Sequence, residues 1–283
     1  MGVEILPFFV DFDIYNKVIR NIMSNNKMTD RLDNSNIVNL VKQQYENKQR
    51  LRIPPVIVKL PSLGKIYPES SPLRDGAVEM RHMTAYDEDI LSNSTYIATG
   101  VVFDKLLESL IVTPGVNVDD ISMTDREGLI IAARIHGYGS KYPVSVRDPK
   151  TNKELERDID LSKLNFKPFN LTSDANGEFD YTVTLNDDKI KFKFITGDIS
   201  KKLDPTRAIS ILLENTIMEV NGNRDKNYIA EYIKYELPAV ASKAFRQYMA
   251  DNMPGLDFIV EFEGEDGSAF KTGFQLGPDL FWF

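Results

Sequence analysis

Residues 124–164, "TDREGLIIAARIHGYGSKYPVSVRDPKTNKELERDIDLSKL", decide the fold because a helical pattern passes directly into a strand–turn–strand pattern. Thr124 and Glu127 have the spacing of a capping box ahead of the apolar run, and glycines follow the run, as is typical of a helix end. Alternating apolar and polar residues then flank a polar turn at residues 149–152. The segment therefore predicts a helix followed by a two-stranded β-ribbon.

Other stretches repeat the strand–turn–strand pattern. Residues 54–60 and 77–83 read as paired strands separated by a long turn-rich loop, and residues 179–197 read as a hairpin around a polar turn. Residues 257–276 predict a second ribbon like the first one, which covers about residues 142–162. Strand pairs thus recur through the chain, each with its own local turn.

Helical patterns separate these strand pairs. Three helices are indicated between residues 84 and 138, and another helix opens at Asp204, which a proline follows, and closes at Gly222. Two more helices are predicted over residues 226–235 and 238–252. No βαβ regularity and no glycine-rich fingerprint accompanies them, so the order favours an α+β fold of helical segments with β-hairpins and ribbons over a doubly wound sheet.

The first fifty residues differ in texture from the rest. Apolar residues recur at helical spacing over residues 13–23 and again over residues 36–48, with a polar stretch between them. We interpret residues 1–50 as a helical N-terminal extension, more an interaction arm than a core. The α+β body then occupies residues 51–283.

Composition limits the classes of function. The 283 residues include no cysteine and two histidines, which leaves no disulfide framework, no thiolate zinc site and no histidine-rich metal centre. The net charge of -8 argues against a nucleic-acid binder, because phosphate contacts need clustered Lys and Arg. No stretch approaches the ~20 apolar residues of a membrane helix, and the N-terminus does not read as a signal peptide. We therefore expect protein partners, no nucleic acid and no membrane.

The stretch Lys59–Glu69, "KLPSLGKIYPE", contains a Gly-Lys pair in a turn after an apolar run, where a phosphate-binding loop could lie. The remaining parts of such a loop are missing, because no glycine precedes Gly64 at the required spacing and Ile66 follows Lys65 where Ser or Thr is needed. We expect a structural turn, no nucleotide affinity, no cofactor and no small-molecule substrate.

Several carboxylates stand close together in the sequence and could bind a cation or serve acid–base chemistry. No nucleophile or metal-ligand partner supports them at a fitting spacing, so we read them as solvated loop charges and expect no enzyme. His136 reads as a half-buried packing residue and His82 as a surface side chain. The carboxylates are Asp11, Asp13, Asp119, Asp120, Glu263, Glu265 and Asp266.

The sequence ends in "LFWF", residues 280–283, which contains the single tryptophan. Exposed aromatics in a row would form an apolar patch of the kind that marks interfaces. Two interpretations stay open: the segment packs into the protein's own core, or it docks on a partner. Phe281, Trp282 and Phe283 are therefore the candidate partner-contact residues.

The stretches "LPSLGKIYP", "GAVEMRHMTAYDEDIL" and "DREGLIIAARIHGYGSKYPV" carry a resemblance that extends over roughly residues 56–283. The chain resembles the baseplate hub subunits and hub assembly proteins of T-even-type contractile-tailed bacteriophages. The resemblance implies that the Pro-Ser-x-Gly-Lys-x-Tyr turn is a recurrent structural element. It also implies other baseplate or hub proteins as partners, with a tape-measure protein as a further candidate.

One departure from that family concerns zinc. The resemblance implies that many relatives carry a Cys-x-x-Cys knuckle in the turn of each ribbon. The four cysteines of the two turns look like a four-thiolate zinc site. The matching positions here are Asp148, Thr151, Glu263 and Asp266. Because zinc prefers thiolate and imidazole ligands, we expect no metal at these positions. The ribbons should instead be held together by packing and hydrogen bonds.

Three functions from different classes follow from these observations. The first is a non-enzymatic structural or assembly component of the baseplate hub, acting through protein contacts. The alternative is a transient chaperone for a hub or tape-measure protein that is absent from the finished virion. The third is an enzyme such as a wall hydrolase, which would need a suitable carboxylate pair. The expected location is the host cytoplasm during tail assembly, with the virion baseplate as the later site.

Overall fold

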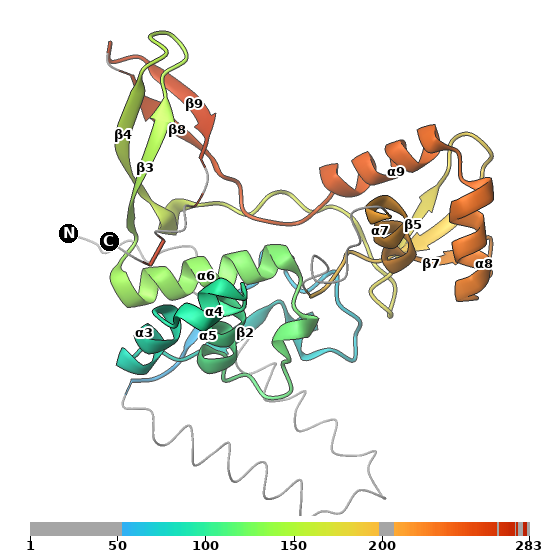
Figure 1. Ribbon diagram of the computed structural model, residues 1–283, viewed down its shortest axis with the longest axis horizontal. Coiled ribbons are helices and arrows are strands. Elements are labelled where there is room, and N and C mark those ends of the chain that lie inside the picture. The colour runs from blue at the N-terminus through green and yellow to red at the C-terminus, as the bar shows by residue number, and fades with distance from the viewer. Residues whose placement is uncertain (1–52, 198–206, 265, 275, 277–279, 282–283) are drawn as a thin grey trace, which may run out of the picture.

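The computed structural model describes residues 53–197, 207–264, 266–274, 276 and 280–281. The predicted helical extension, residues 1–50, lies outside the described residues. Figure 1 shows three regions: a helical region around α6 (Met123–Tyr138), a small sheet with its own helices, and two ribbons that extend away from the body beside α6. The predicted α+β fold is confirmed.

The helices and strands have the following bounds. The helices besides α6 are α3 (Ala85–Leu91), α4 (Ser94–Ala98), α5 (Val102–Leu110), α7 (Ala208–Thr216), α8 (Lys226–Glu231) and α9 (Ala239–Asp251). The strands are β1 (Val56–Lys59), β2 (Ala77–Met80), β3 (Lys141–Arg147), β4 (Glu154–Asp160), β5 (Phe179–Thr182), β6 (Lys189–Phe192), β7 (Ile217–Val220), β8 (Ile259–Glu263) and β9 (Ala269–Gly273).

The helical region contains one helix more than predicted between residues 84 and 138. The long apolar pattern after α3 is divided into α4 and α5 at Gly100, whose φ of 70° is a left-handed conformation that a glycine adopts without steric cost. Apolar spacing continues across this break, which is why the sequence pattern reads as one helix. The prediction of three helices was therefore wrong, because this segment contains four: α3, α4, α5 and α6.

The start of α6 also differs from the prediction. Ser122, not Thr124, is the N-cap, and its hydroxyl oxygen accepts a hydrogen bond from the backbone N–H of Asp125 at 3.2 Å. Both pairs, Ser122–Asp125 and Thr124–Glu127, have the same spacing, so the sequence contains two overlapping cap patterns and the first one is used. Gly139 is the C-cap of α6, as expected.

The predicted hairpin of β5 and β6 is confirmed, and β7 adds a third strand to it in the order β5-β6-β7. The sequence had predicted helix through this strand up to Gly222, which was wrong, because the helix ends at Thr216 and Ile217 and Val220 are buried in the sheet. The predicted cap at Asp204 lies outside the described residues.

One face of this sheet is covered by an aromatic core. Phe179 and Phe192 have ring centroids 5.5 Å apart, and the ring of Phe245 from α9 lies 5.4 Å from that of Phe192. All three side chains are nearly fully buried. A fully buried phenylalanine contributes about 1.5–3 kcal/mol, so this cluster is a main source of the stability of the sheet region.

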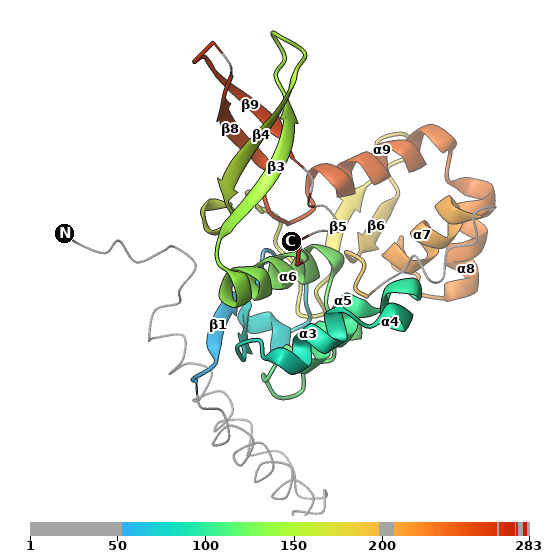
Figure 2. The same cartoon turned by 60° about the vertical axis from the view of Figure 1, so that its left-hand side comes forward.

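The two predicted ribbons are confirmed as antiparallel pairs, β3 with β4 and β8 with β9. Buried and exposed residues alternate along β3, and Phe262 of β8 is also buried. The buried residues of both ribbons belong to one hydrophobic cluster, and Figures 1 and 2 show the ribbons side by side. We call the paired ribbons the ribbon arm.

Candidate protein-interaction site

The turn in Lys59–Glu69 holds the helical region together. Asp125 is fully buried, and its carboxylate accepts hydrogen bonds from the Ser62 backbone N–H at 2.8 Å, the Ser62 hydroxyl at 2.7 Å and the Tyr67 hydroxyl at 2.6 Å. The Tyr67 oxygen in turn accepts the Ser122 N–H at 3.0 Å. Serine and tyrosine of the turn thus fasten it to the first turn of α6.

The glycine and lysine of the same turn also have structural contacts. Gly64 has a φ of 75°, and a Cβ at this position would lie 2.3 Å from the Arg74 carbonyl oxygen, so only glycine fits. The Lys65 ammonium donates to the Phe169 carbonyl oxygen at 3.2 Å. The Gly64 backbone and the Lys65 side chain therefore both make structural contacts within the protein, which supports the interpretation of the motif as a structural turn.

Part of the C-terminal segment is anchored on α6. The buried Arg134 donates from Nε to the Leu280 carbonyl oxygen at 2.7 Å and from Nη1 to the Gly139 carbonyl oxygen at 2.6 Å. Leu280 and Phe281 are both buried. The Phe281 ring lies beside α5 and α6, because its centroid is 6.0 Å from that of Phe103 and 6.2 Å from that of Tyr138.

Of the three candidate contact residues in this segment, Phe281 is therefore packed inside the protein. Trp282 and Phe283 lie outside the described residues, and their role in partner contact stays a prediction.

Because Trp282 is the single tryptophan, its emission reports on this segment. We expect blue-shifted emission in the isolated protein if the segment packs internally, or red emission that turns blue when a partner is added if it docks. Red emission in both states would contradict any packing or interface role.

The tips of the two ribbons meet close to the positions that match the knuckle, through Lys150 and Arg157 of the first ribbon. Asp148 is buried, and its Oδ1 accepts the backbone N–H of Lys150 at 2.8 Å and that of Thr151 at 3.3 Å. From the same turn, the Lys150 ammonium donates to Asp266 at 3.0 Å and to the Ser268 hydroxyl at 2.8 Å. The hydrogen bonds from Ser268 and Lys150 lower the pKa of Asp266 below its usual range.

The fourth position, Glu263, takes part through its backbone. Its carbonyl oxygen accepts from Arg157 Nε at 3.3 Å and from Nη2 at 3.0 Å. The ribbon tips are therefore joined by a lysine–carboxylate pair and an arginine–carbonyl contact. The sequence reasoning expected packing and hydrogen bonds between the ribbons without naming these residues, and the absence of a metal at the knuckle positions stays a prediction.

We predict that the protein binds no zinc stoichiometrically. Within the described residues no group of three or more His, Asp or Glu side chains is arranged to hold a metal ion. Asp266, one of the knuckle positions, already accepts from Lys150 and Ser268. Elemental analysis of the purified protein should find much less than one zinc per chain, and chelator treatment should leave the melting temperature unchanged. One zinc per chain that survives dialysis would contradict this prediction.

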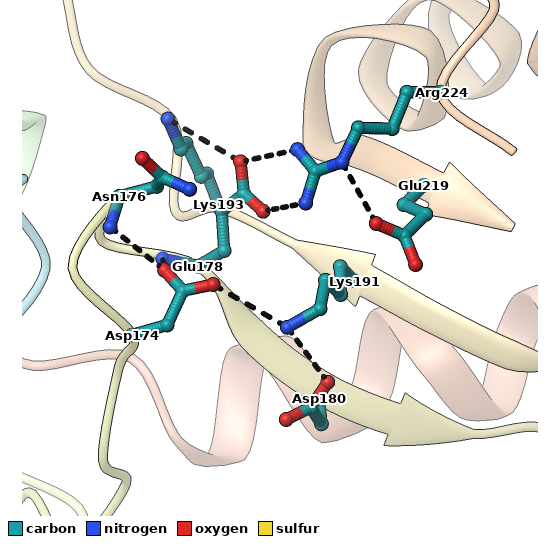
Figure 3. Close-up of polar contacts among 8 residues, drawn as sticks. All are labelled: Asp174, Asn176, Glu178, Asp180, Lys191, Lys193, Glu219 and Arg224. Atoms are coloured by element: carbon teal, nitrogen blue, oxygen red, sulfur yellow. Dashed lines mark hydrogen bonds and ion pairs between the residues drawn. The ribbon is translucent and has the colours of Figure 1, made fainter. Parts of the chain in front are cut away.

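The solvent face of the three-stranded sheet carries a network of paired charges (Figure 3). Glu178, whose side chain is 4% exposed, pairs with Arg224 through both carboxylate oxygens, at 3.1 and 2.8 Å, and Arg224 also pairs with Glu219 at 2.8 Å. Lys191 pairs with Asp174 and Asp180, each at 3.3 Å. Lys193 lies 3.7 Å from Glu178 and adds a third base to the four acids, so most of the charge is paired and the network joins the strands and the loop.

A groove of about 840 Å³ lies between the turn after β1 and the chain that follows β6. Asp119 and Asp120 line it together with Lys193 and Asn215. Asp119 lies 3.7 Å from the Arg126 guanidinium and is largely exposed. The contact with Arg126 and the exposure of Asp119 agree with the interpretation of these two aspartates as solvated loop charges. Asp11, Asp13 and Glu265 lie outside the described residues.

Sequence reasoning missed the residues that make the buried contacts. Asp125 and Arg134 were parts of a helical pattern with no assigned role, and their partners lie 63 and 146 residues away. The available signal was a charged residue at a position where the helix should be apolar, since a buried charge needs a partner.

The two histidines, His82 and His136, lie edge to face with ring centroids 5.8 Å apart, and both are half-buried.

In the described part of the chain, no helix is long and apolar enough to cross a membrane. No curated protein and no solved structure matched the chain in the comparisons. A family model described as T4 bacteriophage base plate protein matches residues 54–272, which begin at the first hairpin, include α6 and the first ribbon, and end within β9 of the second ribbon. The chain therefore belongs to the T4 bacteriophage base plate protein family, and it is a structural or assembly protein of a phage baseplate.

Proposed function

We propose that the chain is a non-enzymatic component of the central hub of the baseplate and that it acts through protein contacts. The ribbon arm carries this proposal, because it extends away from the body and presents two strand pairs to a neighbour (Figure 2). Its internal contacts, Lys150 with Asp266 and Arg157 with Glu263, fix the two ribbons relative to each other. A rigid projecting element loses little entropy when it binds a partner.

Mass spectrometry of purified virions tests this proposal. A hub component should be present in particles at a fixed ratio to the other hub proteins, and it should co-purify with them from infected cells. A chain found with hub or tape-measure proteins in lysate but missing from particles would be a transient chaperone instead. A chain that co-purifies with no baseplate protein in either sample would contradict both functions.

The predicted N-terminal extension gives a second test. We predict that removing residues 1–50 leaves a folded body, because the first described strand pair begins at Val56 and its buried residues contact the body. The truncated protein should keep a cooperative thermal transition but lose binding to its baseplate partners. An insoluble or molten product would show that residues 1–50 belong to the core.

A further inference from the structure

Strand β9 of the second ribbon pairs with β8 along one edge, and two backbone hydrogen bonds show which of its N–H and C=O groups face β8. The Phe274 N–H donates to the Phe258 carbonyl oxygen at 3.2 Å, and the Gly264 N–H donates to the Ser268 carbonyl oxygen at 2.9 Å. In an antiparallel pair, hydrogen-bonded and non-hydrogen-bonded residue pairs alternate. These two bonds therefore fix which residues of β9 point their backbone toward β8 and which point it away.

The alternation directs the backbone groups of Phe270 and Thr272 toward β8 and those of Ala269 and Lys271 away from it. Within the described residues, the outward N–H and C=O groups of Ala269 and Lys271 have no hydrogen-bond partner. The strand pairs with β8 in unbroken register, and it contains no proline. Such an edge can accept a further strand.

The other strands of the ribbon arm are protected against such pairing. Pro143, at an outward position of β3, has no N–H, and the Lys141 carbonyl oxygen accepts from Arg134 at 3.2 Å. On β8, the Glu263 carbonyl oxygen accepts from Arg157. The outward positions of β4 all carry carboxylates: Glu154, Glu156, Asp158 and Asp160. Proline and charged side chains are the usual means of protecting a strand edge. Among the outward positions of β9, only that of Lys271 carries such a residue.

We propose that the β9 edge is the docking site for an extended segment of another baseplate protein, which adds to the second ribbon as a further strand and carries an acidic residue beside Lys271. The proposal rests on the proposed function for the source of the partner, although not for the edge itself. Main-chain hydrogen bonds to Ala269 and Lys271 would supply affinity, and the alternating side chains of the added strand would supply specificity.

Charge and burial define the chemistry of that segment. Lys271 is exposed, and although Glu261 of β8 lies opposite it in the register, Lys271 makes no ion pair within the described residues. A carboxylate on the strand added at the outer edge can therefore approach it from the side away from β8. Phe270 and Thr272 are half-exposed on the opposite face, where an added strand would place apolar side chains. The segment should therefore alternate apolar and acidic residues, because successive side chains of a strand point to opposite faces.

The same lysine argues against a second copy of this chain as the occupant. Two β9 strands that pair antiparallel about their common centre would place Lys271 directly opposite Lys271 of the other copy. Like charges directly opposite each other destabilise a strand pair. A partner strand with a carboxylate at this position has the opposite sign and is therefore favoured.

Fluorescence polarisation with the labelled peptide Val-Asp-Val-Asp-Val-Asp-Val tests the proposal on the full chain. Lys271→Pro removes an outward N–H without breaking a bond to β8, and it should weaken binding by about tenfold or more. The matched control is Ser145→Pro, which changes an outward position on the already protected β3 and should leave the Kd within about twofold. Equal binding by Lys271→Pro and the unchanged protein would overturn the proposal, as would no binding at roughly 1 mM peptide.

Two further probes separate strand addition from plain charge attraction. Methylating the backbone nitrogens of either the aspartates or the valines blocks one edge of the peptide, so one methylated peptide should lose binding and the other should keep it. If both bind equally well, the peptide is not added as a strand. Should Lys271→Pro lower the melting temperature, Lys271→Glu replaces it and should prefer the Val-Lys alternating peptide. A dimer in solution that Lys271→Pro abolishes would instead make a second copy the occupant.

Discussion

Replacing Asp125 with alanine is expected to lower the free energy of unfolding by about 3–5 kcal/mol, which is a large share of the stability of a typical domain. The change deletes the acceptor for the Ser62 N–H, the Ser62 hydroxyl and the Tyr67 hydroxyl, all of them buried. Buried donors without an acceptor keep the full cost of their lost hydration.

Urea denaturation followed by circular dichroism measures this effect. Asp120→Ala is the matched control, because Asp120 is an exposed aspartate just ahead of the same helix and its loss should cost less than about 0.5 kcal/mol. Equal midpoints for the two variants would show that the turn is not fastened to α6 through Asp125.

The second large effect is expected for Arg134→Met, which keeps most of the side-chain length but removes every donor. The carbonyl oxygens of Leu280, Gly139 and Lys141 each lose a hydrogen bond from the guanidinium. We expect a loss of about 3 kcal/mol, because bonds from charged groups to buried carbonyls are worth about 1.5–3 kcal/mol each and part of the loss is recovered by water.

The same variant should also release the C-terminal segment, because Arg134 holds the Leu280 carbonyl oxygen. Carboxypeptidase digestion followed by mass spectrometry should remove the terminal residues faster from Arg134→Met than from the unchanged protein. Arg147→Met, on the exposed face of β3, is the control and should digest at the original rate. Equal digestion of all three proteins would mean that the segment is held by other contacts.

The sequence predicted the elements whose pattern is local. Both ribbons and the hairpin at 179–197 alternate apolar and polar residues around a polar turn, so period and turn chemistry agree. Ile217–Val220 was missed because four residues are too few to distinguish a strand from the last turn of a helix. Its identity as a strand depends on pairing with β6, which is a tertiary contact.

The candidate site was predictable only where a position could be compared with the family. Asp148 and Asp266 drew attention because they stand where the resemblance places cysteines, and the structure does bring the two turns together through Lys150. No local pattern could reveal that Asp125 meets Ser62 and Tyr67, since that contact closes a long loop. Nor does periodicity show which edge of a ribbon is open, because that depends on the hydrogen-bond register.

Cross-linking mass spectrometry of assembled baseplates tests the central claim, that this protein works through the contacts of its ribbon arm. Lys150, Lys153 and Lys271 lie on the arm, whereas Lys226 and Lys243 are exposed on α8 and α9 and serve as internal controls. The arm lysines should form cross-links to other baseplate proteins, and the control lysines should form few or none. Intermolecular cross-links confined to Lys226 and Lys243, with the arm lysines linked only within the chain, would contradict it.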